Sequence, residues 1–231
     1  MMDRATLVSS IDQTLLDPTV GFGQGAAWIE RNACLGFASL CVSPFLVAVA
    51  AQKLAGTATK VCSVCAFPLG YANTETKVSE AMQLVDLGCA EVDMVMNFAA
   101  LLEGEIAFVH DDIAAVREAV REASNGTAIL KVILETGQLT PELVSQGSMI
   151  AVSAGADFVK TSTGFGPRGA SVDDVRIMRQ AVGPDVGVKA AGGIRDLATA
   201  MAMFDAGATR IGASAGDRIM AAFDAQVSVG E

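Results

Sequence analysis

Histidine and patterned cysteines are nearly absent from this 231-residue sequence, which weakens the case for a metal site or a disulfide framework. His110 is the only histidine and lies in a predicted helix. The cysteines have no spacing typical of a disulfide framework; they are Cys34, Cys41, Cys62, Cys65 and Cys89. The one close pair, Cys62 and Cys65, lies in an apolar run without the second pair or the histidines that a metal site needs. We expect buried structural cysteines, no metal ion, and a reducing compartment such as the cytoplasm.

Positive charge is also scarce, since 16 Lys and Arg against 26 Asp and Glu give a net charge of −10. This charge would repel a nucleic acid, and no cluster of basic residues offsets it locally. One uncharged stretch, residues 32–52, is long enough to raise the question of a membrane span. It contains Gly36 and Pro44 and changes its period midway, so a spanning helix is not expected. The first ten residues hold no apolar core of signal-peptide length, and we predict a cytoplasmic location.

What the sequence does contain is a regular alternation of short apolar runs and longer amphipathic segments. Apolar residues make up 52% of the chain and charged residues 18%, a composition that excludes disorder. The expected strands are Ser10–Leu15, Ala38–Val42, Lys60–Ala66, Glu91–Asn97, Ala128–Glu135, Asp157–Ser162, Val186–Ala191 and Thr209–Ser214. The expected helices are Gln24–Ala33, Pro44–Ala55, Thr74–Leu87, Glu105–Ala123, Pro141–Ser153, Val172–Ala181, Asp196–Ala206 and Asp217–Val227. Thr140 before Pro141, and Ser171, are predicted helix N-caps.

A β–α unit that repeats eight times predicts a parallel sheet, because parallel neighbours need crossover helices. Eight units in this length match an α/β fold of the (β/α)8 TIM-barrel type, with outer helices around an eight-stranded barrel. No linker or shift in composition marks a boundary, so we predict a single catalytic domain over residues 1–231. A doubly wound open sheet is the alternative, but the glycine-rich loop that it needs after the first strand is absent.

Ionisable side chains recur on one face of several predicted strands. With a period of two, Asp93 lies opposite the apolar Met94, and Lys160 lies opposite Val159. Lys189, Lys131 and Asp12 follow the same pattern in their own strands, with small Gly187 and Ala191 expected to leave space around Lys189. If the apolar faces pack under the helices, three lysines and several carboxylates converge inside the barrel.

Buried lysines can serve as nucleophiles. Burial lowers the pKa of a lysine and a neighbouring lysine lowers it further, which makes the amine reactive near neutral pH. Because Lys160 and Lys189 lie near the C-terminal ends of their strands, where barrels place active sites, we predict that both are catalytic. Lys131 lies earlier in its strand, where support or proton relay is expected. The alternative is that the three lysines form inert ion pairs with neighbouring carboxylates, namely Glu135, Asp93 and Asp12.

Glycines cluster after the late predicted strands. They fall in Thr163–Pro167, Ala191–Ile194 and Ile211–Gly216, and each segment opens onto a helix. Backbone N–H groups and helix N-termini in such loops bind phosphate in many barrels. Tight turns need glycine in any case, so the evidence lies in three such loops beside two lysine-bearing strands. We therefore predict a phosphorylated substrate.

These motifs resemble the deoxyribose-phosphate aldolase family along almost the full length of the chain. The most specific are Glu91–Val95 (EVDMV), Phe158–Gly164 (FVKTSTG) and Val188–Arg195 (VKAAGGIR), in this order. The resemblance implies reversible cleavage of 2-deoxy-D-ribose 5-phosphate to D-glyceraldehyde 3-phosphate and acetaldehyde. It also implies a class I mechanism through a lysine Schiff base, without metal or other cofactor, and a possible homodimer.

The resemblance also implies roles for individual residues. Lys160 matches the Schiff-base lysine, Lys189 the lysine that tunes it, and Asp93 the carboxylate of the proton relay, with Asp12 in support. The substrate-binding residues would be Cys41 near the site, Thr163 and, at the phosphate, Gly164, Gly192, Gly193 and Ser214.

The sequence departs from the family pattern at a few positions. Gln13 stands where many members carry histidine, but it is expected to face away from Asp12. Ala215 stands where a second phosphate-binding serine is common, which puts the preference for phosphorylated substrates in doubt. Two other functions remain open: another Schiff-base barrel aldolase acting on a ketose phosphate, and a catalytically silent barrel that binds sugar phosphates.

Overall fold

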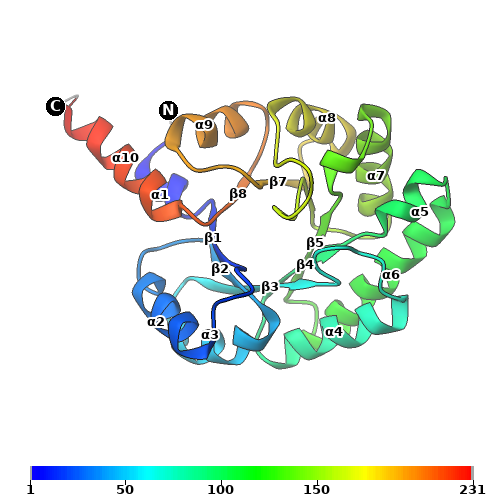
Figure 1. Cartoon of the computed structure of the whole chain (residues 1–231), viewed down its shortest axis with the longest axis horizontal. Coiled ribbons are helices and arrows are strands. Elements are labelled where there is room, and N and C mark those ends of the chain that lie inside the picture. The colour runs from blue at the N-terminus through cyan, green and yellow to red at the C-terminus, as the bar shows by residue number, and fades with distance from the viewer. Residues whose placement is uncertain (1, 230–231) are drawn as a thin grey trace.

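The computed structural model describes residues 2–229 and shows a closed barrel of eight parallel strands in sequence order (Figure 1). The strands are β1 (Ile11–Leu15), β2 (Ser39–Val42), β3 (Lys60–Cys65), β4 (Glu91–Val95), β5 (Ile129–Ile133), β6 (Phe158–Lys160), β7 (Gly187–Ala191) and β8 (Arg210–Ala213). This arrangement confirms the predicted (β/α)8 fold. Residues 1 and 230–231 of the predicted domain lie outside the described residues.

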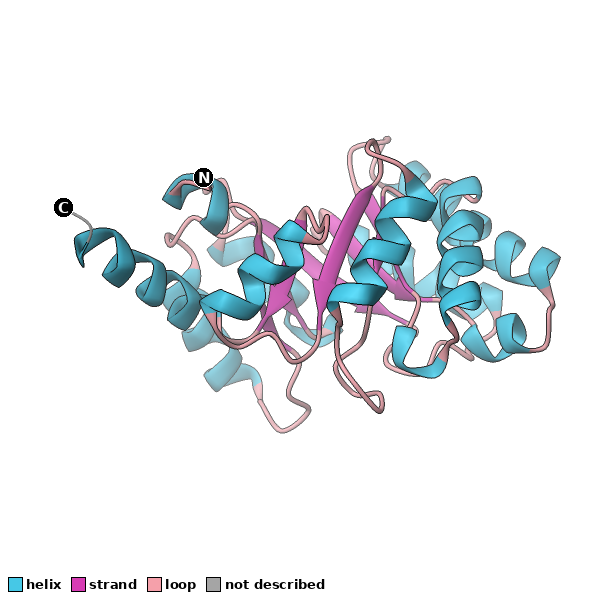
Figure 2. Ribbon diagram, turned by 90° about the horizontal axis from the view of Figure 1, so that it is seen from above, coloured by secondary structure: helices cyan, strands magenta, loops and turns pink. Residues whose placement is uncertain are grey.

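Helices surround the strands, as Figure 2 shows from above. They are α1 (Arg4–Val8), α2 (Phe22–Asn32), α3 (Val47–Lys53), α4 (Thr74–Asp86), α5 (Phe98–Leu102), α6 (Ile106–Ala123), α7 (Pro141–Ser153), α8 (Val172–Val182), α9 (Leu197–Asp205) and α10 (Gly216–Val229), with 3-10 turns η1 (Pro44–Leu46) and η2 (Thr136–Gln138). The predicted N-caps are confirmed, since Thr140 accepts from the N–H of Leu143 and Ser171 from that of Asp174. None of these helices, within residues 2–229, has the length and apolar character needed to cross a membrane.

Two short helices were not predicted. In α1, the Asp3 carboxylate caps the helix by accepting from the N–H of Thr6 at 2.7 Å. In α5, Asn97 accepts from the N–H of Ala100 at 3.1 Å, so Asn97 is a helix cap and not the end of a strand. Each helix has five residues, which is too few to establish a helical period in the sequence.

The apolar faces of the strands pack outward against the helices, as predicted. Val92 and Met94 in β4, and Val159 in β6, are fully buried in the main hydrophobic core between barrel and helices. The chain closes on itself where α1 and α10 lie side by side, joined by an ion pair of 2.7 Å between Arg4 and Asp224 (Figure 1). The opposite strand faces carry the polar residues into the barrel.

Candidate active site

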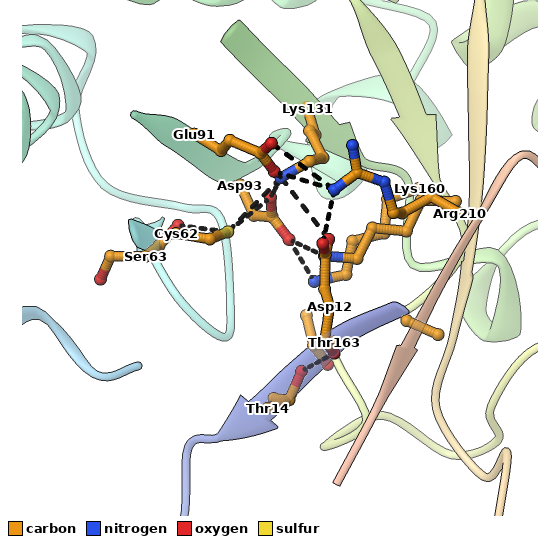
Figure 3. A network of polar contacts seen from close by, with 12 residues as sticks. Asp12, Thr14, Cys62, Ser63, Glu91, Asp93, Lys131, Lys160, Thr163 and Arg210 are labelled. Carbon is orange, nitrogen blue, oxygen red and sulfur yellow. Dashed lines mark hydrogen bonds and ion pairs between the residues drawn. The ribbon is translucent and has the colours of Figure 1, made fainter. Parts of the chain in front are cut away.

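Buried polar side chains from six strands meet inside the barrel, most of them shown in Figure 3. We call the ionised groups joined by ion pairs the barrel network; its members are Asp12, Glu91, Asp93, Lys131, Lys160, Lys189 and Arg210. Burying so many charges is tolerable only when each is paired, and every member has at least one partner of opposite charge.

Asp93 is the centre of the barrel network. Its Oδ2 atom lies 2.8 Å from the Nζ atoms of both Lys160 and Lys189, and its Oδ1 atom lies 2.8 Å from that of Lys131. Strand register explains the convergence, because Asp93 pairs with Lys131 across β4 and β5, and Lys160 pairs with Lys189 across β6 and β7. The predicted grouping of the three lysines with Asp93 is therefore present.

Asp12 forms the second anionic centre. Its Oδ2 atom lies 2.5 Å from the Nζ of Lys189, and its Oδ1 atom accepts from Ser39 at 2.7 Å and from Arg210 at 2.6 Å. Arg210 also reaches the Glu91 carboxylate at 3.2 Å. Arg210 was not predicted, because it begins its strand and only its long side chain carries the charge into the barrel.

The barrel network contains one more cation than carboxylates. The cations are Lys131, Lys160, Lys189 and Arg210, and the carboxylates are Asp12, Glu91 and Asp93, so the net charge is +1 when all are ionised. Lys160 has one ion-pair partner, whereas Lys189 has two and Lys131 three. Lys160 is therefore the lysine least held by carboxylates.

Two aspartates and two lysines of the barrel network stay charged despite burial. Burial raises the pKa of Asp93, but the three neighbouring ammonium groups outweigh it and hold that pKa well below its usual value. The pKa of Asp12 is also lowered despite burial, and Lys189 is the cation that contributes most to the lowering. Burial lowers the pKa of Lys189, but the neighbouring Asp12 and Asp93 carboxylates outweigh burial and raise that pKa. The pKa of Lys131 is raised as well. The expected net lowering of the pKa of the buried lysines is therefore wrong for Lys131 and Lys189, because the carboxylates outweigh the effect of burial.

A cavity of about 420 Å³ opens above the barrel network at the C-terminal ends of the strands. Of the predicted residues, those that line it are Lys160, Thr163, Gly164, Gly192, Gly193 and Ser214. Lys189, Asp93 and Asp12 lie beneath it and are buried. Cys41 is also fully buried and, among the described residues, is not part of the cavity wall.

The cavity wall includes a cation to which the sequence analysis assigned no role. Arg195 is exposed at the rim, and within residues 2–229 it makes no hydrogen bond or ion pair. Asp17 and Thr14 from the β1 end complete the rim. The signal for Arg195 was its place at the end of the VKAAGGIR motif, two residues after the glycine pair that lines the cavity.

The space around Lys189 comes from Gly212 and not, as predicted, from Gly187. A Cβ atom at Gly187 would lie 2.2 Å from the Phe158 ring, so this glycine accommodates the ring and not the lysine. A Cβ atom at Gly212 would lie 3.0 Å from Cε of Lys189. Gly212 in the neighbouring strand β8 therefore provides the room, a pairing that depends on strand register.

Within residues 2–229, two groups of side chains offer metal-ligand atoms within 4.8 Å of one another: Cys41, Cys62 and Asp93, and Asp12, Cys62 and Glu91. The Lys131 ammonium already lies 2.8 Å from Asp93 and 3.4 Å from the Cys62 sulfur. A divalent cation would have to displace it and would add charge to a network that is already positive. Cys62 points into the barrel while Cys65 lies on the outer side, against the backbone of Lys77. Cys62 and Cys65, although close in sequence, therefore cannot bind one metal ion together.

A closed parallel barrel with a lysine-lined cavity at the C-terminal ends of its strands defines a TIM-barrel enzyme. Residues 6–222 match the DeoC/LacD family of aldolases, and the chain belongs to this family. A relative named deoxyribose-phosphate aldolase 1, from Bacillus licheniformis, is 49% identical over 210 residues, which cover 91% of this chain and 92% of that protein. A relative named deoxyribose-phosphate aldolase, from Streptococcus mutans, is 50% identical over 210 residues, covering 91% and 93%.

Solved structures agree with this assignment. The tetrameric structure of deoxyribose phosphate aldolase from Aeropyrum pernix has a TM-score of 0.85 to this chain at 31% sequence identity. The match covers 97% of this chain and 93% of that one, so the likeness extends over the whole barrel.

Proposed function

We propose that this enzyme reversibly cleaves 2-deoxy-D-ribose 5-phosphate to D-glyceraldehyde 3-phosphate and acetaldehyde through a Schiff base on Lys160. The observation that carries the proposal is the position of Lys160, which ends β6 at the base of the 420 Å³ cavity beside Asp93 and Lys189. The names of relatives at 49–50% identity support the choice of substrate.

Lys160 is the best candidate nucleophile among the three lysines. It alone of the three lines the cavity, and it has the fewest carboxylate partners. Lys189 keeps its charge because Asp12 and Asp93 raise its pKa, so a positive group stays beside the Lys160 amine. Lys189 is thus fixed as a cation beneath the cavity, and Lys160 is the lysine that a substrate in the cavity can reach.

The proposed steps use these groups in order. The Lys160 amine adds to the C1 aldehyde to give a carbinolamine, and loss of water gives an iminium ion. The iminium accepts the electron pair as the C2–C3 bond breaks, while a base removes the proton of the C3 hydroxyl. Protonation of the resulting enamine and hydrolysis by water release acetaldehyde and the free amine. Asp93, which contacts both ammonium groups, is proposed as the proton relay, with Asp12 fixing Lys189.

The phosphate is proposed to bind at the opposite side of the same cavity. Gly164, Gly192, Gly193 and Ser214 line it, and Arg195 supplies a cation without a partner among the described residues. Backbone N–H groups, together with this guanidinium, would offset the negative charge of the chain as a whole. Ala215 is buried, so the serine side chain common at this position is missing from the proposed phosphate site.

Trapping of the Schiff base tests the proposal directly. The protein is incubated with 2-deoxyribose 5-phosphate and borohydride, and intact mass and peptide mapping follow. An adduct of the sugar phosphate or of the two-carbon fragment on Lys160 is expected. No adduct, or one on Lys131 or Lys189, would overturn the assignment.

The remaining expectations belong to the same proposal. The chemistry needs no cofactor beyond the lysine, because the iminium itself accepts the electrons. We infer a cytoplasmic role in the breakdown of deoxyribonucleotide-derived sugar phosphates, and a homodimer remains the predicted assembly. Mass photometry would test the assembly, for which the tetrameric relative provides the obvious alternative.

A further inference from the structure

A carboxylate outside the barrel network holds the loop that forms one wall of the cavity. Glu135 follows β5 with φ +57°, a left-handed conformation that is unfavourable for a residue with a Cβ atom. Its side chain is buried and makes no ion pair with Lys131, although the sequence offered Glu135 as an ion-pair partner of the barrel lysines. A strained backbone that turns a buried carboxylate away from the barrel calls for a structural or functional reason.

The contacts of Glu135 lead to the β6–α8 loop, residues 161–171. Its Oε2 atom accepts from the N–H of Thr163 at 3.2 Å and from the Thr163 hydroxyl in a short hydrogen bond. The same hydroxyl oxygen accepts from the N–H of Phe165 at 3.0 Å. A chain of hydrogen bonds therefore fixes three successive residues of the loop, with Gly164 in the middle.

The loop also packs directly on the carboxylate. A Cβ atom at Gly166 would lie 2.7 Å from Oε1 of Glu135, so the backbone approaches as closely as glycine allows. Farther along, Arg168 donates to the carbonyl of Thr136 at 3.0 Å, which anchors the outer part of the loop to the same turn. Thr163 and Gly164 line the catalytic cavity, whereas Glu135 does not.

We propose that Glu135 is a positioning residue that sets phosphate affinity by holding Thr163 and Gly164 at the cavity wall. This inference rests on the proposed phosphate site. Glu135 acts on the loop and not on Lys160, because the end of β6 is held independently by the sheet. The carbonyl of Lys160 accepts from the N–H of Leu134, and the N–H of Thr161 donates to the carbonyl of Lys189.

The effect should therefore fall on substrate binding and not on the chemical step. Glu135→Ala removes the acceptor for both Thr163 donors, and we expect KM for 2-deoxyribose 5-phosphate to rise roughly tenfold or more. The value of kcat should stay close to that of the wild type. With unphosphorylated 2-deoxyribose, which does not use the phosphate site, kcat/KM should not change.

Matched variants separate this role from others. Glu135→Gln keeps a carbonyl oxygen for both Thr163 donors and should restore most of the affinity. Gln138→Ala, an exposed neighbour in the same turn, should behave as the wild type. An equal loss of kcat on both substrates, or a Glu135→Gln enzyme as weak as Glu135→Ala, would overturn the proposal.

A readout that does not depend on activity completes the test. Hydrogen exchange, followed by mass spectrometry, should show faster exchange in the peptide that carries the Thr163 and Phe165 amides of Glu135→Ala, and inorganic phosphate should bind more weakly. Unchanged exchange there would overturn the positioning role even in an active enzyme. If the wild type fails to cleave the sugar phosphate, the proposed function falls, but exchange and phosphate binding still decide the role of Glu135. Should Glu135→Ala not fold, Thr163→Val removes the hydroxyl contact alone. It is expected to raise KM for 2-deoxyribose 5-phosphate by a smaller factor.

Discussion

At the residue scale, one carboxylate oxygen is shared by two ammonium groups, since Oδ2 of Asp93 lies 2.8 Å from both Lys160 and Lys189. Such sharing is favourable only if the carboxylate is ionised, and the depressed pKa of Asp93 meets that condition. The two lysines differ in their other contacts. Lys189 is also held by Asp12, whereas Lys160 faces the cavity, so the same local charge produces a fixed cation and a reactive amine.

Replacement of the reactive amine should abolish turnover without unfolding the barrel. In Lys160→Ala, Asp93 keeps Lys131 and Lys189 as partners, and the excess positive charge of the network disappears. We expect kcat to fall by roughly three orders of magnitude or more, with an unchanged circular dichroism spectrum. Lys60→Ala, at an exposed lysine that begins β3, is the control. Substantial activity in Lys160→Ala would contradict the mechanism.

Replacement of the fixed cation should slow the reaction and change its pH dependence. In Lys189→Leu the ionised Asp93 carboxylate acts on Lys160 without the competing Lys189 ammonium group. We expect kcat/KM at neutral pH to fall about a hundredfold and the acidic limb of the pH–rate profile to move to higher pH. Lys189→Arg, which keeps a positive charge, should shift the profile less. A slower enzyme with an unshifted profile would mean that Lys189 acts by packing alone.

Sequence reasoning located residues whose side chains follow the two-residue period and missed those that depend on neighbouring strands. Asp12, Asp93 and the three lysines were placed on the interior face by period alone. Arg210 and Gly212 acquire their roles from the register between β7, β8 and β1, which a single sequence does not contain. Glu135 was offered as an ion-pair partner of the barrel lysines because its left-handed backbone, which turns it away from them, has no local signal in the sequence.

At the scale of elements, all eight strands and the eight main helices were predicted, and the differences have local causes. Strand β6 has three residues where six were expected. Thr161 leaves the regular strand because its hydroxyl bonds both the carbonyl and the N–H of Ala191 in β7. The shorter strand releases residues from 161 onward into the loop that Glu135 holds.

A buried ion pair between α4 and α6 makes a prediction at this scale. Lys77 and Asp112 lie 2.6 Å apart with side chains 0% and 1% exposed, and Lys77 also donates to the carbonyl of Val95 at the end of β4. Lys77→Met would leave the Asp112 carboxylate buried, with the Thr74 hydroxyl as its remaining hydrogen-bond partner among the described residues. We expect a loss of about 3–5 kcal/mol in the free energy of unfolding, measured with urea.

The double variant separates the pair from its packing. Lys77→Met with Asp112→Leu removes both charges together, and most of the lost stability should return, because a well-packed apolar pair is often as stable as a buried ion pair. If the double variant is as unstable as the sum of the single variants, the two side chains are not coupled and the argument fails.

At the scale of the whole molecule, the barrel network links stability to pH. The folded-state pKa values of Asp12 and Asp93 lie below those of unfolded aspartates, so the unfolded chain binds more protons in acid. Their stabilisation is fully present above about pH 4 and is lost as the pH falls toward the depressed values. The pKa of Lys189 is raised, so its contribution is present below about pH 10 and is lost as the pH rises through the raised value.

We therefore expect a plateau of stability between these limits and a steep fall below about pH 4, measured by urea unfolding across the acid range. Asp12→Asn keeps an oxygen acceptor for Ser39 and Arg210 but cannot ionise. It should be less stable than the wild type at pH 7, because Lys189 and Arg210 lose a counter-charge, and its stability should fall less steeply in acid. Asp205→Asn, at an exposed position that ends α9, should follow the wild-type curve. If Asp12→Asn and the wild type decline in parallel below pH 4, then the acid sensitivity of the fold does not come from Asp12, and Asp93 is the remaining aspartate of the barrel network with a depressed pKa.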